Sequence, residues 1–131
     1  MEKRLFNFGV PWEKNISFSQ GVSVRGGRLI FLSGQASIDD EGQVVGKGDM
    51  ELQVRTALEA VRRGLALAGA TPADVIKLNV YTTDCRAFHK TQPIREVFFP
   101  KPYPAQTLVE VSRLAMRDFL VELEVIAVVN D

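Results

Sequence analysis

The chain has 131 residues, of which 46% are hydrophobic and 24% charged, which is typical of a globular domain and excludes a disordered or collagen-like chain. Its 16 Lys and Arg residues balance 16 Asp and Glu residues, so no basic field predicts binding to RNA or DNA. Cys85 is the only cysteine and no apolar run suits a secretory signal or a membrane span, so we expect one cytosolic domain over residues 1–131 with no membrane contact.

Two β-rich runs are predicted in the first third of the chain, at residues 16–25 and 28–37. Gly26 and Gly27 lie between them, and both can adopt the positive φ angles of a tight turn. We therefore expect the two runs to pair as an antiparallel hairpin. The sequence Asp-Asp-Glu-Gly at 39–42 then predicts a turn before the first helix.

Apolar residues recur every three or four positions from Met50 to Ala68, which predicts an amphipathic helix. Asp49 is suited to cap its N-terminus, and Gly69 is suited to the left-handed position at its end. The buried face is expected to carry Val54, Ala57, Leu58, Val61, Leu65 and Ala68, and the solvent face Gln53, Glu59, Arg62 and Arg63.

The middle of the chain predicts a short capped turn at 71–72, a strand with one buried face at 75–83 and a second helix that starts after Asp84 and runs to Phe99. Pro93 lies within that helix and lacks a backbone donor, so it should kink or split the helix. Three prolines follow and favour an extended crossing segment, namely Pro100, Pro102 and Pro104.

Two further strands are predicted at residues 106–114 and 118–129, joined by the sequence AMRD. The resulting order of elements predicts an α+β fold with the helices on one face of a mainly antiparallel or mixed sheet. The last strand alternates Phe119, Val121, Leu123, Val125 and Ala127 with Leu120, Glu122, Glu124, Ile126 and Val128. Because the second set is also largely apolar, we expect self-association to cover it.

Glu122 and Glu124 point the same way from this apolar strand, where desolvation disfavours the ionised carboxylate and suits a general acid or base. Spacing alone favours the structural alternative, in which one or both pair with a base such as Arg113 or Lys77 across a subunit boundary. Neither role is decided by the sequence.

Other reactive side chains predict no site of their own. His89 lacks further metal ligands at suitable spacing, so no metal is expected. Cys85 follows the expected cap Asp84, where a helix dipole can lower a thiol pKa, but no Cys-His partnership is recognisable and we expect an inert thiol. The glycines have neither Walker nor dinucleotide-fold spacing, so they predict no phosphate site.

Four segments together resemble the Rid family, also called the YjgF family or reactive-intermediate deaminases, over about residues 18–128: FLSGQASIDDEGQVVG, LALAGATPADVIKLNVYTTD, VFFPKPYPAQTLVEVSRL and VELEVIAV. The resemblance implies a chorismate-mutase-like α+β fold with two main helices on one face of the sheet. It also implies a homotrimer that binds small-molecule substrates in clefts between subunits. The implied reaction is cofactor-independent hydrolysis of enamines or imines to ketones and ammonia.

In the deaminating members of that family, an arginine that grips the substrate carboxylate occupies the place of Gln106. Glutamine keeps two amide donors but no charge, a loss of roughly 1.5 to 3 kcal/mol of binding for a charge-assisted hydrogen bond. The resemblance thus implies a substrate other than 2-iminobutanoate. Glu122 matches the carboxylate that handles the water or transferred proton. The implied substrate-binding residues are Gln106, Phe18 (often Tyr), Ser33, Gly34, Gln92 (often Asn) and Leu108.

Several alternatives remain open from the sequence. Arg95 and Arg113 are candidate replacements for the missing arginine, and Gln106 is as well suited to satisfying backbone groups at the start of its strand. Loss of the usual arginine and tyrosine also fits a non-catalytic trimer that binds a metabolite or a partner protein. Ribonuclease or translation-inhibitor activity, attached to some relatives, is a minor alternative because the chain has no net positive charge and no paired histidines.

Overall fold

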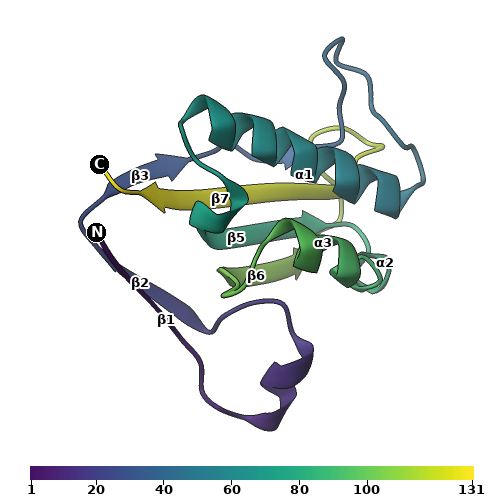
Figure 1. The fold of residues 1–131 in the computed structure, drawn as a ribbon. Coiled ribbons are helices and arrows are strands. Elements are labelled where there is room, and N and C mark those ends of the chain that lie inside the picture. The colour runs from purple at the N-terminus through teal and green to yellow at the C-terminus, as the bar shows by residue number, and fades with distance from the viewer.

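The computed structural model describes all 131 residues, and its main sheet has the order β3 (Arg28–Phe31), β7 (Val121–Val129), β5 (Val75–Thr82), β6 (Ala105–Glu110). The short strand β4 (Gln35–Ala36) also pairs with β7. β5 and β6 run parallel, whereas every pairing of β7 is antiparallel. The sheet is therefore mixed and mainly antiparallel, as the sequence predicts (Figure 1).

The helices α1 (Met50–Leu67), α2 (Cys85–His89) and α3 (Gln92–Phe98) supply the apolar cover of this sheet, and α1 lies across it in Figure 1. Two short 3-10 helices, η1 (Pro11–Asn15) and η2 (Pro72–Asp74), interrupt the loops. Val121, Leu123 and Val125 of β7 are at most 1% exposed beneath the helices. Each such side chain contributes about 1.5 to 3 kcal/mol by leaving water. The alternate residues Glu122 and Glu124 are half-buried on the opposite face, so the predicted alternation is confirmed from Val121 to Ala127, whereas Val128 is fully buried.

The predicted helix boundaries are confirmed by their capping contacts. The Asp49 carboxylate accepts from the Leu52 amide at 3.0 Å, and Gly69 ends α1 with a φ of 77°. Asp84 caps α2 by accepting from the Ala87 amide at 3.0 Å. Pro93 splits the second helical region into α2 and α3, because proline has no N–H to continue the ladder of backbone hydrogen bonds.

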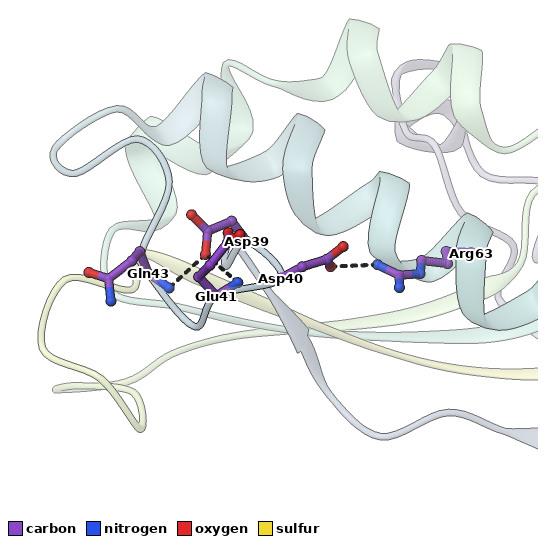
Figure 2. A network of polar contacts seen from close by, with 5 residues as sticks. All are labelled: Asp39, Asp40, Glu41, Gln43 and Arg63. Carbon is purple, nitrogen blue, oxygen red and sulfur yellow. Dashed lines mark hydrogen bonds and ion pairs between the residues drawn. The ribbon is translucent and has the colours of Figure 1, made fainter.

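The predicted turn before α1 is built around Asp39, whose carboxylate accepts from the amides of Glu41 at 3.0 Å and Gln43 at 2.8 Å (Figure 2). Arg63 reaches this turn from α1 and donates to Asp40 at 2.7 Å. That hydrogen bond, reinforced by the charge of Asp40, raises the pKa of Arg63. Both side chains are solvent-exposed, so the pair adds little stability, whereas the Asp39 bonds shape the backbone.

The predicted hairpin between residues 16–25 and 28–37 is wrong. β2 (Gly21–Arg25) pairs instead with β1 (Glu2–Phe6), a strand that the charged sequence EKRLF did not signal. β3 pairs with β7, and Figure 1 shows the β1–β2 hairpin projecting away from the main sheet. Gly26 and Gly27 do have positive φ angles of 75° and 83°, but the chain opens there instead of turning back.

The reason is a contact that precedes β2. Ser19 forms a parallel bridge to Ala105, its amide donates to the Pro104 carbonyl at 3.0 Å, and its hydroxyl donates to the Tyr103 carbonyl at 2.5 Å. These bonds fasten the chain to β6, at the edge of the sheet opposite β3. β2 must therefore cross between the two edges and cannot lie along β3 of its own chain.

The last two strands are also shorter than predicted, since β6 ends at Glu110 and β7 begins at Val121. They are not neighbours, because β5 lies between them. β5 ends at Thr82, so the chain beyond Val111 has no strand left to pair with and forms a loop. Sequence alternation alone cannot show where the partner strand stops.

Gln53 was predicted to face solvent, but its side chain is fully buried. Its amide nitrogen donates to the carbonyls of Gly46 at 3.1 Å and Asp118 at 2.8 Å, and its oxygen accepts from the Leu120 amide at 2.8 Å. Gln53 lies one turn before Ala57 and therefore shares the apolar face of α1. It ties α1 to the loops that precede α1 and β7.

We expect Gln53→Met to lower the free energy of unfolding by about 2 to 4 kcal/mol, because it removes three hydrogen bonds and leaves buried backbone groups without partners. Urea unfolding followed by circular dichroism measures the change. Glu59→Gln on the exposed face of the same helix is the control and should shift stability by less than about 0.5 kcal/mol. Equal effects of the two substitutions would show that the buried amide is dispensable.

Candidate functional site

A cavity of about 150 Å³ lies between the segment after η1, the helices α2 and α3, and strand β6. Four of the residues predicted to bind substrate line it together, namely Phe18, Gln92, Gln106 and Leu108. The remaining lining residues are Ile16, Ser17, Phe88, His89 and Arg95. The structure thus brings together the part of the predicted site that comes from the segment before β2, from α3 and from β6.

Gln106 lies opposite Leu78 in the parallel pairing of β6 with β5, which turns its side chain toward the helices. The side chain forms no hydrogen bond with any other residue, so it does not satisfy the backbone at the start of its strand. Phe18 is brought to the same cavity by the bonds that fasten Ser19 to β6. Both residues are available to a ligand.

Gln92 also lines this cavity, and its amide nitrogen donates to the Asn15 carbonyl at 2.9 Å and to the Glu96 carboxylate at 2.8 Å. It thereby holds the end of η1 against α3. The bond to Asn15 also fixes the loop that carries Phe18. Gln92 therefore shapes the wall of the cavity.

Arg95 is the one buried charged residue that lines this cavity, and it is 4% exposed. Its guanidinium carbon lies 4.2 Å from the centre of the Phe88 ring. Its nitrogens donate only to hydroxyls, at 3.3 Å to Thr91 and 3.5 Å to Ser17, and it forms no salt bridge. Burial lowers the pKa of Arg95 to about 10, so the group keeps its charge at neutral pH. Arg113, the other candidate, lines a separate hollow with Thr83 and Arg117.

The remaining predicted residues form a second group at β7. The backbone at Gly34 packs against Glu122 so closely that a Cβ at this position would lie 2.6 Å from the carboxyl carbon of Glu122. Only glycine fits there without a displacement of the acid. The Glu122 carboxylate forms no hydrogen bond or salt bridge. Ser33, which precedes Gly34 in the chain, is exposed.

Glu124, unlike Glu122, forms hydrogen bonds within the chain. Its carboxylate accepts from the Asn79 amide at 3.0 Å and from the Tyr81 hydroxyl at 3.2 Å. The hydrogen bond to Glu124 and the charge of that carboxylate raise the pKa of Tyr81, with a smaller effect from Glu122. Lys77 donates to the Thr107 hydroxyl at 2.8 Å and pairs with neither acid. The two glutamates therefore have different roles within the chain.

The two groups of predicted residues lie on opposite faces of the sheet. Gln106 shares a face with Leu78, beneath the helices, whereas Glu122 pairs with Tyr81 on the uncovered face. One chain cannot bring Gln106 and Glu122 to the same small molecule. A site that uses both requires a second copy of the chain.

Other candidate groups add no chemistry of their own. Burial, followed by the charges of Glu110 and Asp84, raises the pKa of the Cys85 thiol, so little thiolate forms near neutral pH. His89 is exposed at the rim of the cavity. No three His, Cys, Asp or Glu side chains gather as a metal site. None of the helices has both the length and the apolar character that crossing a bilayer requires.

A family model and individual relatives of known sequence both match most of this chain. Residues 13–129 match the family model described as Endoribonuclease L-PSP. The chain is 39% identical over 110 residues to a RutC family protein of Pyrococcus abyssi, covering 84% of each chain. It is 33% identical over 115 residues to the putative reactive intermediate deaminase TdcF of Escherichia coli, covering 85% of each chain.

Solved structures show the same fold. A Rid family protein of unknown function from Yersinia pestis, YyfB, matches with a TM-score of 0.89 and 27% identity, covering 98% of this chain and 100% of that one. A member of the YjgF family from Mycobacterium tuberculosis has the same coverage and 30% identity but a TM-score of 0.67. The backbone arrangement therefore varies among relatives of equal coverage.

We expect Glu124→Gln to lower the pKa of Tyr81 toward the ordinary value of about 10, because the charged acceptor of its hydroxyl is removed. Absorbance at alkaline pH in a Tyr103→Phe background measures the titration of Tyr81 alone. The matched variant Glu122→Gln should lower that pKa by less. A larger effect from Glu122→Gln would contradict the assignment of Glu124 as the engaged acid.

Proposed function

The chain belongs to the Rid family, the group described by the Endoribonuclease L-PSP model, and from this premise we propose that it hydrolyses small enamines or imines to carbonyl compounds and ammonia. The observation that carries this proposal is the unpaired Glu122 carboxylate held against Gly34. A carboxylate with no partner in its own chain is available to move protons for a bound molecule. The deaminase named among the relatives supports the reaction class.

In the proposed reaction an enamine first becomes an imine by moving a proton from nitrogen to its terminal carbon. Water then adds to the imine carbon, and Glu122 accepts a proton from that water as the C–O bond forms. The same carboxyl returns this proton to nitrogen, which gives a carbinolamine. Glu122 then carries the hydroxyl proton to the amino nitrogen as the C–N bond breaks and the C=O bond forms, so that ammonia leaves and a ketone remains. These reaction steps need only water and one proton-transfer group, so we propose no cofactor.

We further propose that the working form is a homotrimer with the substrate in clefts between subunits. The positions of Gln106 and Glu122 on opposite faces of one sheet support a composite site, since only a neighbouring copy brings a second Glu122 to the helix-side cavity. In this arrangement Gln106 donates a neutral hydrogen bond to the substrate. Standard 2-iminobutanoate deamination is then not the expected main activity, because Gln106 lacks the charge of the usual arginine.

A non-catalytic binding role is the second candidate, favoured by Phe18 and Gln106 at the positions where deaminating relatives carry tyrosine and arginine. Ligand-dependent thermal shifts without turnover would support it. Ribonuclease activity has weaker support, because the net charge is zero and the only histidine, His89, has no second histidine for acid–base catalysis.

We expect Glu122→Gln to slow release of ammonia from freshly generated 2-aminoacrylate or from neutral and cyclic enamines by 100-fold or more, as is usual for loss of a proton-transfer group (about 10² to 10⁴). A coupled ammonia assay measures the rate. Glu124→Gln is the matched control on the same face of β7 and should retain most activity. Wild-type rates equal to buffer on every substrate, or no difference between the two variants, would contradict the proposal.

A further inference from the structure

We propose that Arg95, together with Gln106, forms a binding site for a small carboxylate in the cavity beneath α3. The anion is expected to sit between the guanidinium on the helix and the amide on β6, and to be the carboxylate end of a short-chain substrate. The identification of the anion as part of a substrate rests on the proposed function. The anion site itself does not.

Burial of Arg95 without a salt bridge is the first argument. A guanidinium is seldom removed from water unless a carboxylate or a phosphate compensates its charge. The Phe88 ring and two hydroxyls at 3.3 Å and 3.5 Å are neutral, and no carboxylate lies within salt-bridge distance of the guanidinium. The charge of Glu96, the next residue, acts on Arg95 and opposes the lowering of its pKa, but Glu96 forms no ion pair with it and accepts a hydrogen bond from Gln92. An anion entering the cavity would supply the missing partner.

The content and size of the cavity give the second argument. Gln106 has no partner within the chain, so a charged donor and a neutral donor border the same space. The volume of about 150 Å³ corresponds to roughly five water molecules, which suits a carboxylate of three or four carbons. The positive charge that the resemblance places on β6 is thus provided from the facing helix, so this inference revises the expectation drawn from Gln106 alone and admits small anionic substrates.

Isothermal titration of the full chain with pyruvate tests the site directly, since pyruvate is the carbonyl product of 2-aminoacrylate hydrolysis. We expect pyruvate to bind and its neutral amide, pyruvamide, to bind at least tenfold more weakly. Arg95→Met should weaken pyruvate binding by tenfold to 100-fold, which is the usual effect of losing a charge-assisted hydrogen bond. Arg95→Lys should restore part of the affinity while Met does not.

Arg62→Met is the matched control, because Arg62 also lies over an aromatic ring, at 4.7 Å from Phe98, but is exposed and paired with Glu59. It should leave pyruvate binding unchanged. Equal binding of pyruvate and pyruvamide, or an Arg95→Met protein that is folded by circular dichroism and binds pyruvate normally, would overturn the inference. Inorganic phosphate binding tighter than pyruvate would also overturn the carboxylate assignment.

The binding readout separates this inference from the proposed function. Pyruvate binding that depends on Arg95, in a protein that releases no ammonia from any enamine, would uphold the anion site and reject catalysis. Ammonia release that depends on Glu122 but not on Arg95 or on the charge of the substrate would uphold catalysis and reject the anion site.

A second inference comes from the open hairpin. We infer that the β1–β2 hairpin pairs with strand β3 of a second copy of this chain, so that the subunits exchange their N-terminal segments. The outer edge of β3 has no partner, and neither does the edge of β2 that faces away from β1. Unpaired edges of this kind recruit strands. Leu29 and Phe31 on β3 are 53% and 68% exposed, which leaves an apolar surface for the incoming strand.

The sequence specifies a register for this exchange. The two-residue turn that Gly26 and Gly27 predict would place Val24 opposite Leu29 and Val22 opposite Phe31, which are apolar pairs on one face. Within one chain, the bonds from Ser19 to β6 prevent this pairing. Exchange between chains keeps those bonds and forms the same pairs.

The same register brings the two halves of the candidate site together. Continued from Val22 and Phe31, it places the neighbour's Gly34 opposite Ser19 of this chain. Gly34 contacts Glu122 in its own chain, and Ser19 adjoins Phe18 at the cavity that holds Gln106. The exchanged hairpin therefore brings the partner's Glu122 to the cavity of this chain. A composite site requires this placement.

Disulfide trapping in a Cys85→Ser background tests the exchange. We expect Val24→Cys with Leu29→Cys to yield disulfide-linked dimers and trimers on oxidation, seen by non-reducing electrophoresis. Val24→Cys with Leu67→Cys, where Leu67 is 86% exposed at the end of α1, is the control and should stay uncrosslinked. Mixing chains that carry only one of Val24→Cys and Leu29→Cys should give the mixed dimer. An intrachain disulfide, or no disulfide in the first pair, would overturn the inference.

Discussion

Strand β7 is the constraint on which the rest of the molecule depends. It pairs with β3, β4 and β5, and its alternation divides the sheet into a dry face and an uncovered one. Val121, Leu123 and Val125 are closed under the helices, which leaves Glu122 and Glu124 on the other side. A shift of one residue in this strand would put two carboxylates into the apolar core, so the core itself fixes where the acids lie.

The same sheet also separates the guanidinium of Arg95 from the carboxylate of Glu122. A buried guanidinium lies on the helix side and an unpaired carboxylate on the open side, and neither forms a salt bridge within the chain. An oligomer that places one face against another resolves both at once. In the oligomer that we propose, the binding of an anion at Arg95 and the availability of Glu122 would be two consequences of one incomplete protomer.

Much of the fold was predictable because its signals are local. The amphipathic period of α1, the caps at Asp49 and Asp84, the break at Pro93 and the alternation of β7 each depend on neighbours within one turn or one strand. The hairpin prediction failed because pairing depends on a distant contact, the bridge from Ser19 to Ala105. Gln53 was misplaced because its polarity was given more weight than its position on the buried face.

The candidate site divides in the same way. The sequence by itself determined which side chains are present, including the acid Glu122, the neutral Gln106 and the close-packed Gly34, because residue type and family resemblance are properties of the chain alone. Only the tertiary structure decided that Arg95 and not Arg113 enters the cavity of Gln106, and that Glu122 lies across the sheet from both. The physical reason is that strand order and helix docking, which set these positions, arise from contacts between residues far apart in the chain.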